Sequence, residues 1–341
     1  MALNKEGRGN GINLSALSRF PGSFFPRGKK GVFFTFVAVV FLALLIFSSS
    51  IRGHFNLRQI SFATETRIGT MNMFISDVEE DIERGTYIAG FRSLVAMADE
   101  IVTNGEYIDD ADMVFNELFF NGTINSTNSS LLVNNSFTDW MSKIKAEAGK
   151  IDLTINFSDL GAEIYQESPW EVCVEIHTEI FITDREKTSS WRKNRTIKSY
   201  IELNGFEDPL YPMGTNGLVE NRIEETIHTN FTIGTDVDNL LNHTYDGYYI
   251  AFSGAPSYLM RLEGNLSSSM YGIESLVDID ELISKGVDVE SKSIVDYIYF
   301  SGDDPVDYEV DGTPSWFKLD NETDSSGNLT HLDVYQVNEL I

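Results

Sequence analysis

The 341-residue sequence is poor in residues that whole classes of protein need. It has one cysteine, Cys173, which excludes an intramolecular disulfide framework and any metal site built from several thiolates. Bases are scarce, with 25 Lys and Arg against 52 Asp and Glu, and the net charge of −27 argues against a nucleic-acid partner. A hydrophobic content of 42% is too high for a disordered chain, so the sequence can form a real core.

Motifs that carry chemistry are also missing. There is no phosphate-binding loop, no dinucleotide glycine fingerprint, and Ser257 lacks the G-x-S-x-G context of a hydrolase nucleophile. The sequence therefore predicts no enzymatic activity and no cofactor. On the strand described below, His177 and Cys173 fall on the solvent-facing side, where we expect an unpaired, partly covered thiol. The histidines also give no sign of a metal clamp, because no two of them are spaced two or four residues apart. They are His54, His177, His228, His243 and His331.

The charges are divided along the chain. Residues 1–31 carry six bases and one acid, a net charge of +5, and the twenty residues 32–51 (VFFTFVAVVFLALLIFSSSI) carry none. Twenty helical residues span roughly 30 Å, the thickness of the bilayer core. From residue 53 onward there are 51 acids and 18 bases, a net charge of −33. Under the positive-inside rule this predicts a single-pass protein of the cell membrane, with a cytoplasmic N-terminus and an extracellular C-terminal domain.

Two other interpretations of residues 32–51 remain open. The stretch resembles a cleaved secretory signal in having Ser48 and Ser50 as small residues before a cut, but the basic leader is long for one. A buried core helix fits less well, because every residue is uncharged and the flank is basic.

Asparagines in N-x-Ser/Thr triplets are unusually frequent after residue 52. Of 21 asparagines there, eleven begin such a triplet, whereas chance gives roughly 3 or 4. Clustering of Asn, Ser and Thr in turns accounts for the dense group before residue 135 but not for those spread to residue 328. We expect a glycosylated surface protein, modified at Asn121, Asn125, Asn128, Asn134, Asn156, Asn194, Asn230, Asn242, Asn265, Asn321 and Asn328.

The pattern after the apolar stretch predicts helices first. Residues 52–104 form an amphipathic helical stalk with Gly53 and Gly85 as kinks and a stop at Asn104–Gly105. The apolar stripe of this helix is either the seam of a coiled coil or the face on which a globular domain packs. Its short length favours the second alternative. The stripe consists of Ile68, Met71, Ile75, Val78 and Ile82. Residues 105–149 contain helices at 110–120 and 136–149 around the glycan-rich loop 121–135.

Residues 150–341 form the predicted β-rich extracytoplasmic domain. Apolar residues alternate with polar ones over 151–157, 170–182 and 197–203, which predicts an antiparallel meander with one buried face. We further expect helices at 217–228 and 272–284, and strands at 248–252, 293–300 and 332–337. Helices followed by a sheet are typical of the α+β class. The expected order is a transmembrane helix that continues into an amphipathic helix, followed by a head domain made of an antiparallel β-meander and short helices.

Lys29-Lys30-Gly31 before a long apolar helix resembles the class III signal of archaeal type IV pilin-like proteins. The resemblance covers residues 29 to about 102 by motif and the rest only by the order of elements. It implies cleavage between Gly31 and Val32, self-assembly through the new N-terminal helix, and a β-sheet head packed on that helix. The segment VFFTF after the cut lacks the small or polar residues common there, and a generic membrane anchor stays the alternative.

One acidic loop resembles part of a calcium site. Asp307, Glu309 and Asp311 alternate before Gly312, as oxygen ligands do in the first half of an EF-hand loop. Lys318 stands where that loop needs glutamate, so the sequence predicts at most an irregular Ca²⁺ site against a default of a solvated acidic loop. The overall expectation is a structural or adhesive surface protein whose partners are the membrane, other copies or other surface proteins. A ligand-binding sensor ectodomain and a membrane-anchored hydrolase are the alternatives.

Overall fold

The computed structural model describes residues 29–187 and 189–341, with the side chains of 29–32 and 52–64 set aside. The predicted leader, residues 1–31, therefore lies outside the described residues except for its last three. The chain divides into two compact units, of which the first ends at Gly69 and the second spans residues 70–341. The finer division predicted from sequence, with boundaries at 51, 104 and 149, stays a prediction.

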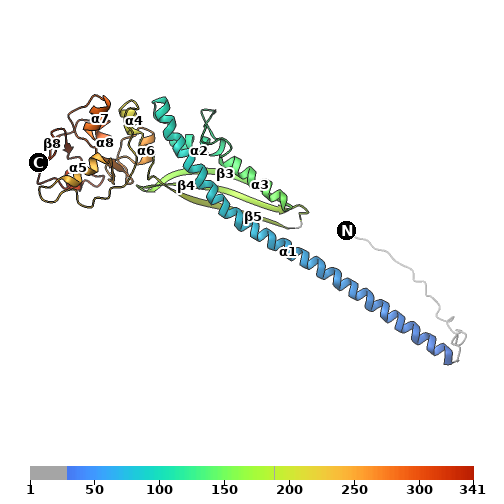
Figure 1. Ribbon diagram of the computed structural model, residues 1–341. Helices are drawn as coiled ribbons and strands as arrows, with labels where there is room; N and C mark the ends of the chain where they lie inside the picture. Colours follow the sequence, from blue (N-terminus) through green and yellow to red (C-terminus); the bar gives the residue numbers. More distant parts are fainter. Residues whose placement is uncertain (1–28, 188) are drawn as a thin grey trace, which may run out of the picture. The chain divides into compact units, whose positions relative to one another are not determined.

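Helix α1 (Lys29–Asn104) contributes the described part of the first unit and continues into the second (Figure 1). In the first unit, Phe33–Ile51 is long and apolar enough to cross a membrane, and all its side chains are exposed. An exposed stretch of nineteen mostly apolar residues needs a non-aqueous neighbour, so it fits a single membrane span or a signal segment. The helix ends where expected, because Gly105 adopts φ +68°, which favours glycine.

A three-stranded antiparallel sheet forms the middle of the second unit, and the predicted meander is confirmed. Its strands are β3 (Leu153–Ser168), β4 (Glu171–Asp184) and β5 (Ser190–Glu202), in the order β3-β4-β5. Even-numbered residues of β4 from 172 to 182 are buried, while most odd-numbered ones are only half-buried. The period-2 pattern thus reflects a sheet with one face in the core and one nearer to water.

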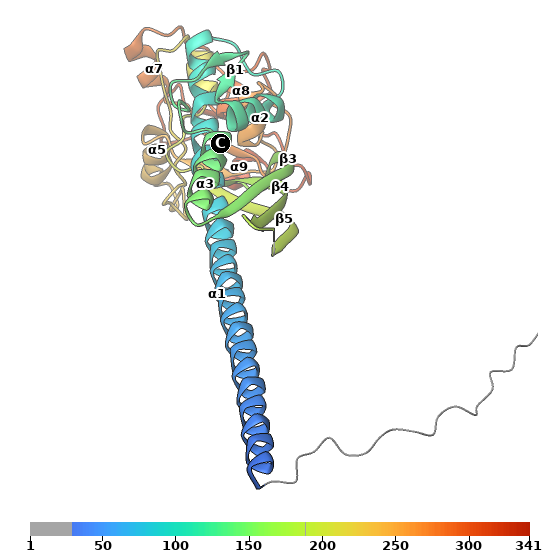
Figure 2. The same cartoon turned by 90° about the vertical axis from the view of Figure 1, so that its right-hand side faces the viewer.

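Helices cover the buried face. The C-terminal part of α1 and helix α3 (Phe137–Lys150) lie side by side over it, with α2 (Ala111–Asn121) beside β3 (Figures 1 and 2). A small hairpin, β1 (Thr123–Ile124) with β2 (Thr127–Asn128), follows α2. The helices predicted at 110–120 and 136–149 are confirmed as α2 and α3. Helix α3 begins with a capping box, in which Ser136 and Asp139 satisfy each other's backbone N–H groups.

The predicted kink at Gly85 is wrong, because α1 continues through it. The reason is packing: a Cβ at Gly85 would lie 2.7 Å from the Trp140 ring, so only glycine lets α3 approach this closely. Gly90 plays a related role against the sheet, since its Cβ would lie 3.0 Å from Ile201 and 3.1 Å from Val174. Both glycines mark close contacts of α1 with its neighbours.

The C-terminal part of the second unit surrounds a second apolar cluster and consists of short elements. It contains two antiparallel two-stranded sheets, which are β6 (Tyr249–Ala251) with β7 (Ile273–Ser275) and β8 (Asp307–Glu309) with β9 (Lys318–Asp320). The elements are α4 (Leu210–Gly214), α5 (Asp238–Tyr245), β6 (Tyr249–Ala251), α6 (Tyr258–Leu262), β7 (Ile273–Ser275), α7 (Ile279–Lys285), α8 (Asp296–Tyr299), β8 (Asp307–Glu309), β9 (Lys318–Asp320) and α9 (His331–Val334).

Several predictions fail in this part. Residues 217–228 form bridges and turns instead of a helix, and the helix predicted at 272–284 is correct only in its second half, since the range contains β7 and then most of α7. The expected buried strand at 293–300 is buried but contains α8, and the expected strand at 332–337 coincides with most of α9. Short apolar runs do not distinguish a strand from a helical turn, which explains these errors. The strand at 248–252 is confirmed as β6, and the α+β class is correct.

Candidate functional site

The two edges of the sheet differ. Strand β3 has two register shifts against β4, and its Ile164 N–H is taken by Asp112 of α2 at 3.4 Å. Strand β5 pairs with β4 through thirteen successive residues without a shift, and no described strand pairs with its other side. Bulges and side-chain caps are ways to block an edge. The regular β5 edge is blocked by neither, which makes it the more accessible surface.

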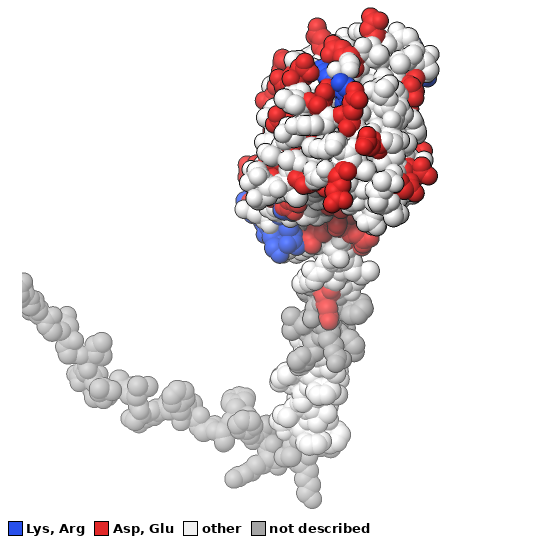
Figure 3. All heavy atoms as spheres, turned by 90° about the vertical axis from the view of Figure 1, so that its left-hand side faces the viewer, with Lys and Arg blue, Asp and Glu red and all other residues white. Residues whose placement is uncertain are grey.

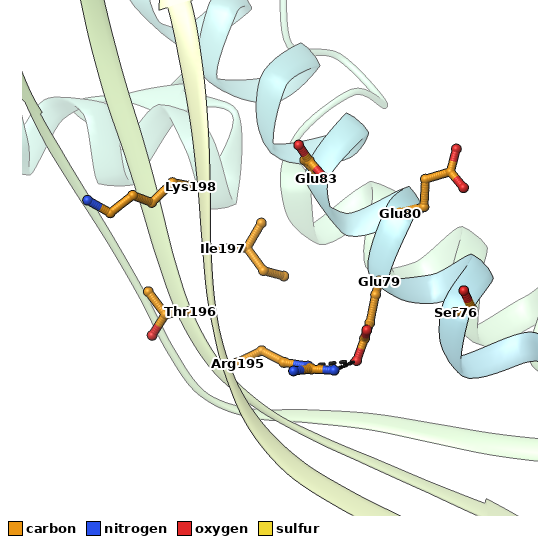
Figure 4. A pocket seen from close by; sticks show the side chains of 8 residues that line it. All are labelled: Ser76, Glu79, Glu80, Glu83, Arg195, Thr196, Ile197 and Lys198. Atoms are coloured by element: carbon orange, nitrogen blue, oxygen red, sulfur yellow. Dashed lines mark hydrogen bonds and ion pairs between the residues drawn. The ribbon is translucent and has the colours of Figure 1, made fainter. Parts of the chain in front are cut away.

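A groove of about 510 Å³ runs between α1 and β5. Figure 4 shows Arg195 and Ile197 pointing toward α1, while Thr196 and Lys198 point away from it. Arg195 donates to Glu79, with Nε 2.6 Å from Oε1, and this partly buried ion pair links β5 to α1. The groove is therefore closed at one point by a charge-assisted contact that fixes the helix on the strand.

The face of the sheet opposite α1, called the outer face below, carries a cross-strand polar network. Lys198 lies 2.9 Å from Glu167 and 3.5 Å from Glu175, and Tyr165 donates to Glu175. The Tyr165 hydrogen bond lowers the pKa of Glu175, and the Lys198 hydrogen bond lowers the pKa of Glu167. Cys173 lies beneath this network and is fully buried, so the prediction of a partly covered thiol is wrong. Burial raises its pKa, which keeps it a protonated, unreactive thiol.

Bases concentrate at one end of the β4–β5 hairpin. Six of the 16 bases of residues 70–341 lie in residues 185–198, whose only acid is Glu186, whereas this unit carries a net charge of −34. Figure 3 shows these blue side chains gathered on a surface that is otherwise mostly red and white. Four of the six are exposed at or beside the turn, and we call them the basic turn: Arg185, Lys187, Arg192 and Lys193.

Acids concentrate at the other end of the same hairpin. A cleft of about 360 Å³ is lined by four glutamates together with Trp170, Asn204 and Ile223, and we call it the acidic cleft. Two of the glutamates, Glu171 and Glu202, lie directly opposite each other in the β4–β5 register. Like charges in that position are destabilising. The other two, Glu224 and Glu225, are exposed.

The C-terminal part contains a fully buried ion network that the sequence did not reveal. Arg261 lies 2.5 Å from Asp208 and 2.9 Å from Asp296, and all three side chains are 0% exposed. Tyr249 donates to Asp208 at 2.8 Å, and Ser275 donates to Asp296 at 2.9 Å. Burial raises the pKa of Asp208 against the opposing field of Arg261. The network joins α6, α8 and the segment before α4, and its three charged side chains have no contact with solvent.

A second buried group surrounds His331. Its Nδ1 lies 2.6 Å from Asp320 and its Nε2 lies 3.1 Å from Glu274. Burial opposes a charge here, but Glu274 and Asp320 outweigh it and raise the pKa of His331 to about 10. The imidazole is therefore a charged link between α9, β7 and β9. Its position in a turn-rich segment gave no periodic signal from which sequence reasoning could infer burial.

The eleven asparagines of the predicted glycosylation sites are all exposed. Of the nine other asparagines beyond residue 52 whose side chains are described, five are exposed and four are half-buried. Asn156 and Asn194 lie on the outer face of the sheet, on either side of β4. Every predicted site is therefore accessible to a modifying enzyme in the folded protein.

The predicted calcium ligands are placed on or after β8. Asp307 forms an ion pair with Lys318 at 3.3 Å, Glu309 is exposed, and Asp311 follows the strand. Among the described residues, no group of three or more His, Cys, Asp or Glu side chains is arranged so that it could hold a metal ion. Lys318 thus neutralises Asp307, one of the three carboxylates expected as calcium ligands. Gly31 and Val32 belong to α1, but their side chains lie outside the described part.

Comparisons with models of known protein families, with characterised proteins and with solved structures found no match for this chain.

Proposed function

We propose that this chain is a single-pass, N-glycosylated protein of the cell surface with a structural or adhesive role. The observation that carries the proposal is the exposure of all eleven predicted glycosylation sites in a chain that also has one apolar stretch fit to span a membrane. The strongly acidic character of residues 70–341 is consistent with this proposal, since high net charge keeps an exposed domain soluble.

We further propose that the chain is processed like archaeal type IV pilin-like proteins, by cleavage between Gly31 and Val32. The support is the Lys29-Lys30-Gly31 motif before the apolar stretch, together with an α1 that provides both the apolar segment and a face for the sheet. Removal of the leader exposes an apolar N-terminal helix, which buries its surface by bundling with helices of other copies.

The test is the N-terminus of the mature protein, isolated from the native host and measured by mass spectrometry. We expect Val32 as the first residue and glycans on several of the eleven asparagines. Gly31→Leu is expected to accumulate the uncut chain, while the matched control Gly28→Leu is cut normally. A mature chain that begins at Met1, or at a residue after Ser48, would refute the pilin-like processing, and unmodified asparagines would refute the glycosylation.

A further inference from the structure

The β4–β5 hairpin has ends of opposite charge. The basic turn surrounds the Thr183–Ser190 pair, with Arg185 and Lys187 beyond it and Arg192 and Lys193 on the last paired part of β5, and the acidic cleft begins at the Glu171–Glu202 pair. Thirteen paired positions without a register shift separate the two ends by about 40 Å. One rigid element therefore presents two complementary surfaces that cannot reach each other within the same copy.

Most charges of the basic turn are available to a partner, although Arg192 pairs with Glu179 at 3.6 Å. Lys187 and Lys193 are exposed, and neither has an ion pair with any described residue. Arg185 pairs with Asp152 at 3.2 Å, but both side chains are more than 70% exposed, so the pair contributes little. Bases on an edge also oppose pairing with another strand. The surface is thus suited to acidic side chains and unsuited to extending the sheet.

The acidic cleft lacks a cation of its own. None of its four glutamates forms an ion pair among the described residues, although Glu171 and Glu202 face each other across the strands. The half-buried Trp170 offers an aromatic face beside them, and a cation over an indole is favourable. A lysine side chain entering this cleft would relieve the repulsion between the paired glutamates.

We propose that the acidic cleft of one copy receives Lys187 and its neighbours in the basic turn of a second copy. This proposal rests on the proposed role as a surface protein, and it specifies how the second units (residues 70–341) of two copies contact each other. A polyanion would account only for the turn and a soluble polyamine only for the cleft, whereas a second copy accounts for both. The two surfaces lie at opposite ends of a hairpin, and the contact we propose repeats head-to-tail, so that it adds copies in a chain; a pair of antiparallel copies closed on itself would give dimers alone and would contradict it.

Cross-linking in the native host tests the contact in the full-length protein. Ser190→Cys and Asn204→Cys place thiols beside the basic turn and in the acidic cleft without changing any charge, and Cys173 is buried. A short bis-maleimide, which adds one thiol at each end, is expected to give dimers, trimers and larger species with the double variant. Each single variant is expected to stay monomeric. A double variant that stays monomeric while both thiols take up a monofunctional maleimide would overturn the proposal.

Charge reversal in the same double-cysteine background separates a specific contact from crowding. Lys187→Glu with Lys193→Glu, and separately Glu224→Lys with Glu225→Lys, are each expected to reduce cross-linked species at least tenfold. All four changes together are expected to restore at least half of the original yield. The exposed pair Lys143→Glu with Lys145→Glu serves as the control and leaves the yield unchanged.

The outcome of this test is distinguishable from that of the proposed function. Chains that begin at Val32 and carry glycans but give no ladder would refute the head-to-tail contact alone. If reversing both surfaces does not restore cross-linking, the ladder arises from another contact and the proposal fails.

Discussion

Arg261 offers the sharpest test of how the second unit is held together. Its guanidinium serves Asp208 and Asp296, both of which are 0% exposed, and it also donates to the backbone carbonyl of Ile273. Arg261→Met keeps most of the side-chain volume but leaves two buried carboxylates without their cation. Removing one partner of a buried ion pair typically costs about 3–5 kcal/mol, which for a unit of this size lowers the melting temperature by on the order of 10 °C.

The loss is expected to depend on pH in a defined direction. Burial already raises the pKa of Asp208 with Arg261 present, and removing the arginine removes the main opposing effect. A carboxyl group whose folded pKa exceeds its unfolded value contributes stability at low pH and loses it as pH rises through the folded pKa. The Arg261→Met variant is therefore expected to be less destabilised near pH 4 than near pH 7.

Chemical denaturation of the full-length protein in detergent, followed by tryptophan fluorescence, measures the free energy of unfolding. Arg84→Met is the matched control, since Arg84 pairs with Glu80 and Asp81 at the surface and its side chain is 60% exposed. We expect that control to lose less than about 0.5 kcal/mol. A loss below about 1 kcal/mol for Arg261→Met, or an equal loss at both pH values, would refute the reasoning.

Three further predictions concern other contacts. The pKa of His331 is raised to about 10 in the folded protein, so the stability that its charge contributes is fully present below its ordinary pKa near 6.5 and is lost as pH rises to about 10. The free energy of unfolding of the wild type is therefore expected to fall between these two pH values, and to fall less in His331→Gln. Gly85→Val forces a side chain into the Trp140 ring and is expected to cost about 1–3 kcal/mol, and no change in melting temperature would contradict the packing argument. Ser136→Ala removes the cap of α3 and is expected to cost about 1 kcal/mol in the same assay, whereas a neutral result would show that the cap is dispensable.

Sequence reasoning succeeds where long periodic segments decide the structure. Strand β4 alternates over fourteen residues and α1 carries an apolar stripe, so pattern alone identified both. It fails in the C-terminal part, where elements of three to eight residues are set by tertiary contacts. The apolar run containing α8 illustrates this, because burial was predicted correctly while the backbone conformation was not.

The surfaces used in the proposals were only partly predictable. The glycosylation triplets and the overall charge are properties of the sequence, and both were read from it directly. Glu171 and Glu202 face each other only because of the register in which β4 pairs with β5. That register could not be predicted, because the sequence does not fix the length of the turn between the strands. The burial of Arg261 and His331 was not predictable either, since Asp208, Asp296 and Glu274, which are three of their four carboxylate partners, lie 35 to 57 positions away in the sequence.

The order in which the Arg261 network is synthesised has a consequence for biogenesis. The ribosome makes Asp208 first, Arg261 53 residues later and Asp296 another 35 residues after that. Until Asp296 emerges, Arg261 lacks one of its two buried carboxylate partners, and the contacts that α8 supplies are missing. Because burying a partly satisfied charge is costly, this part of the second unit is expected to close only after residue 296 has been made and to stay open to proteases and chaperones until then.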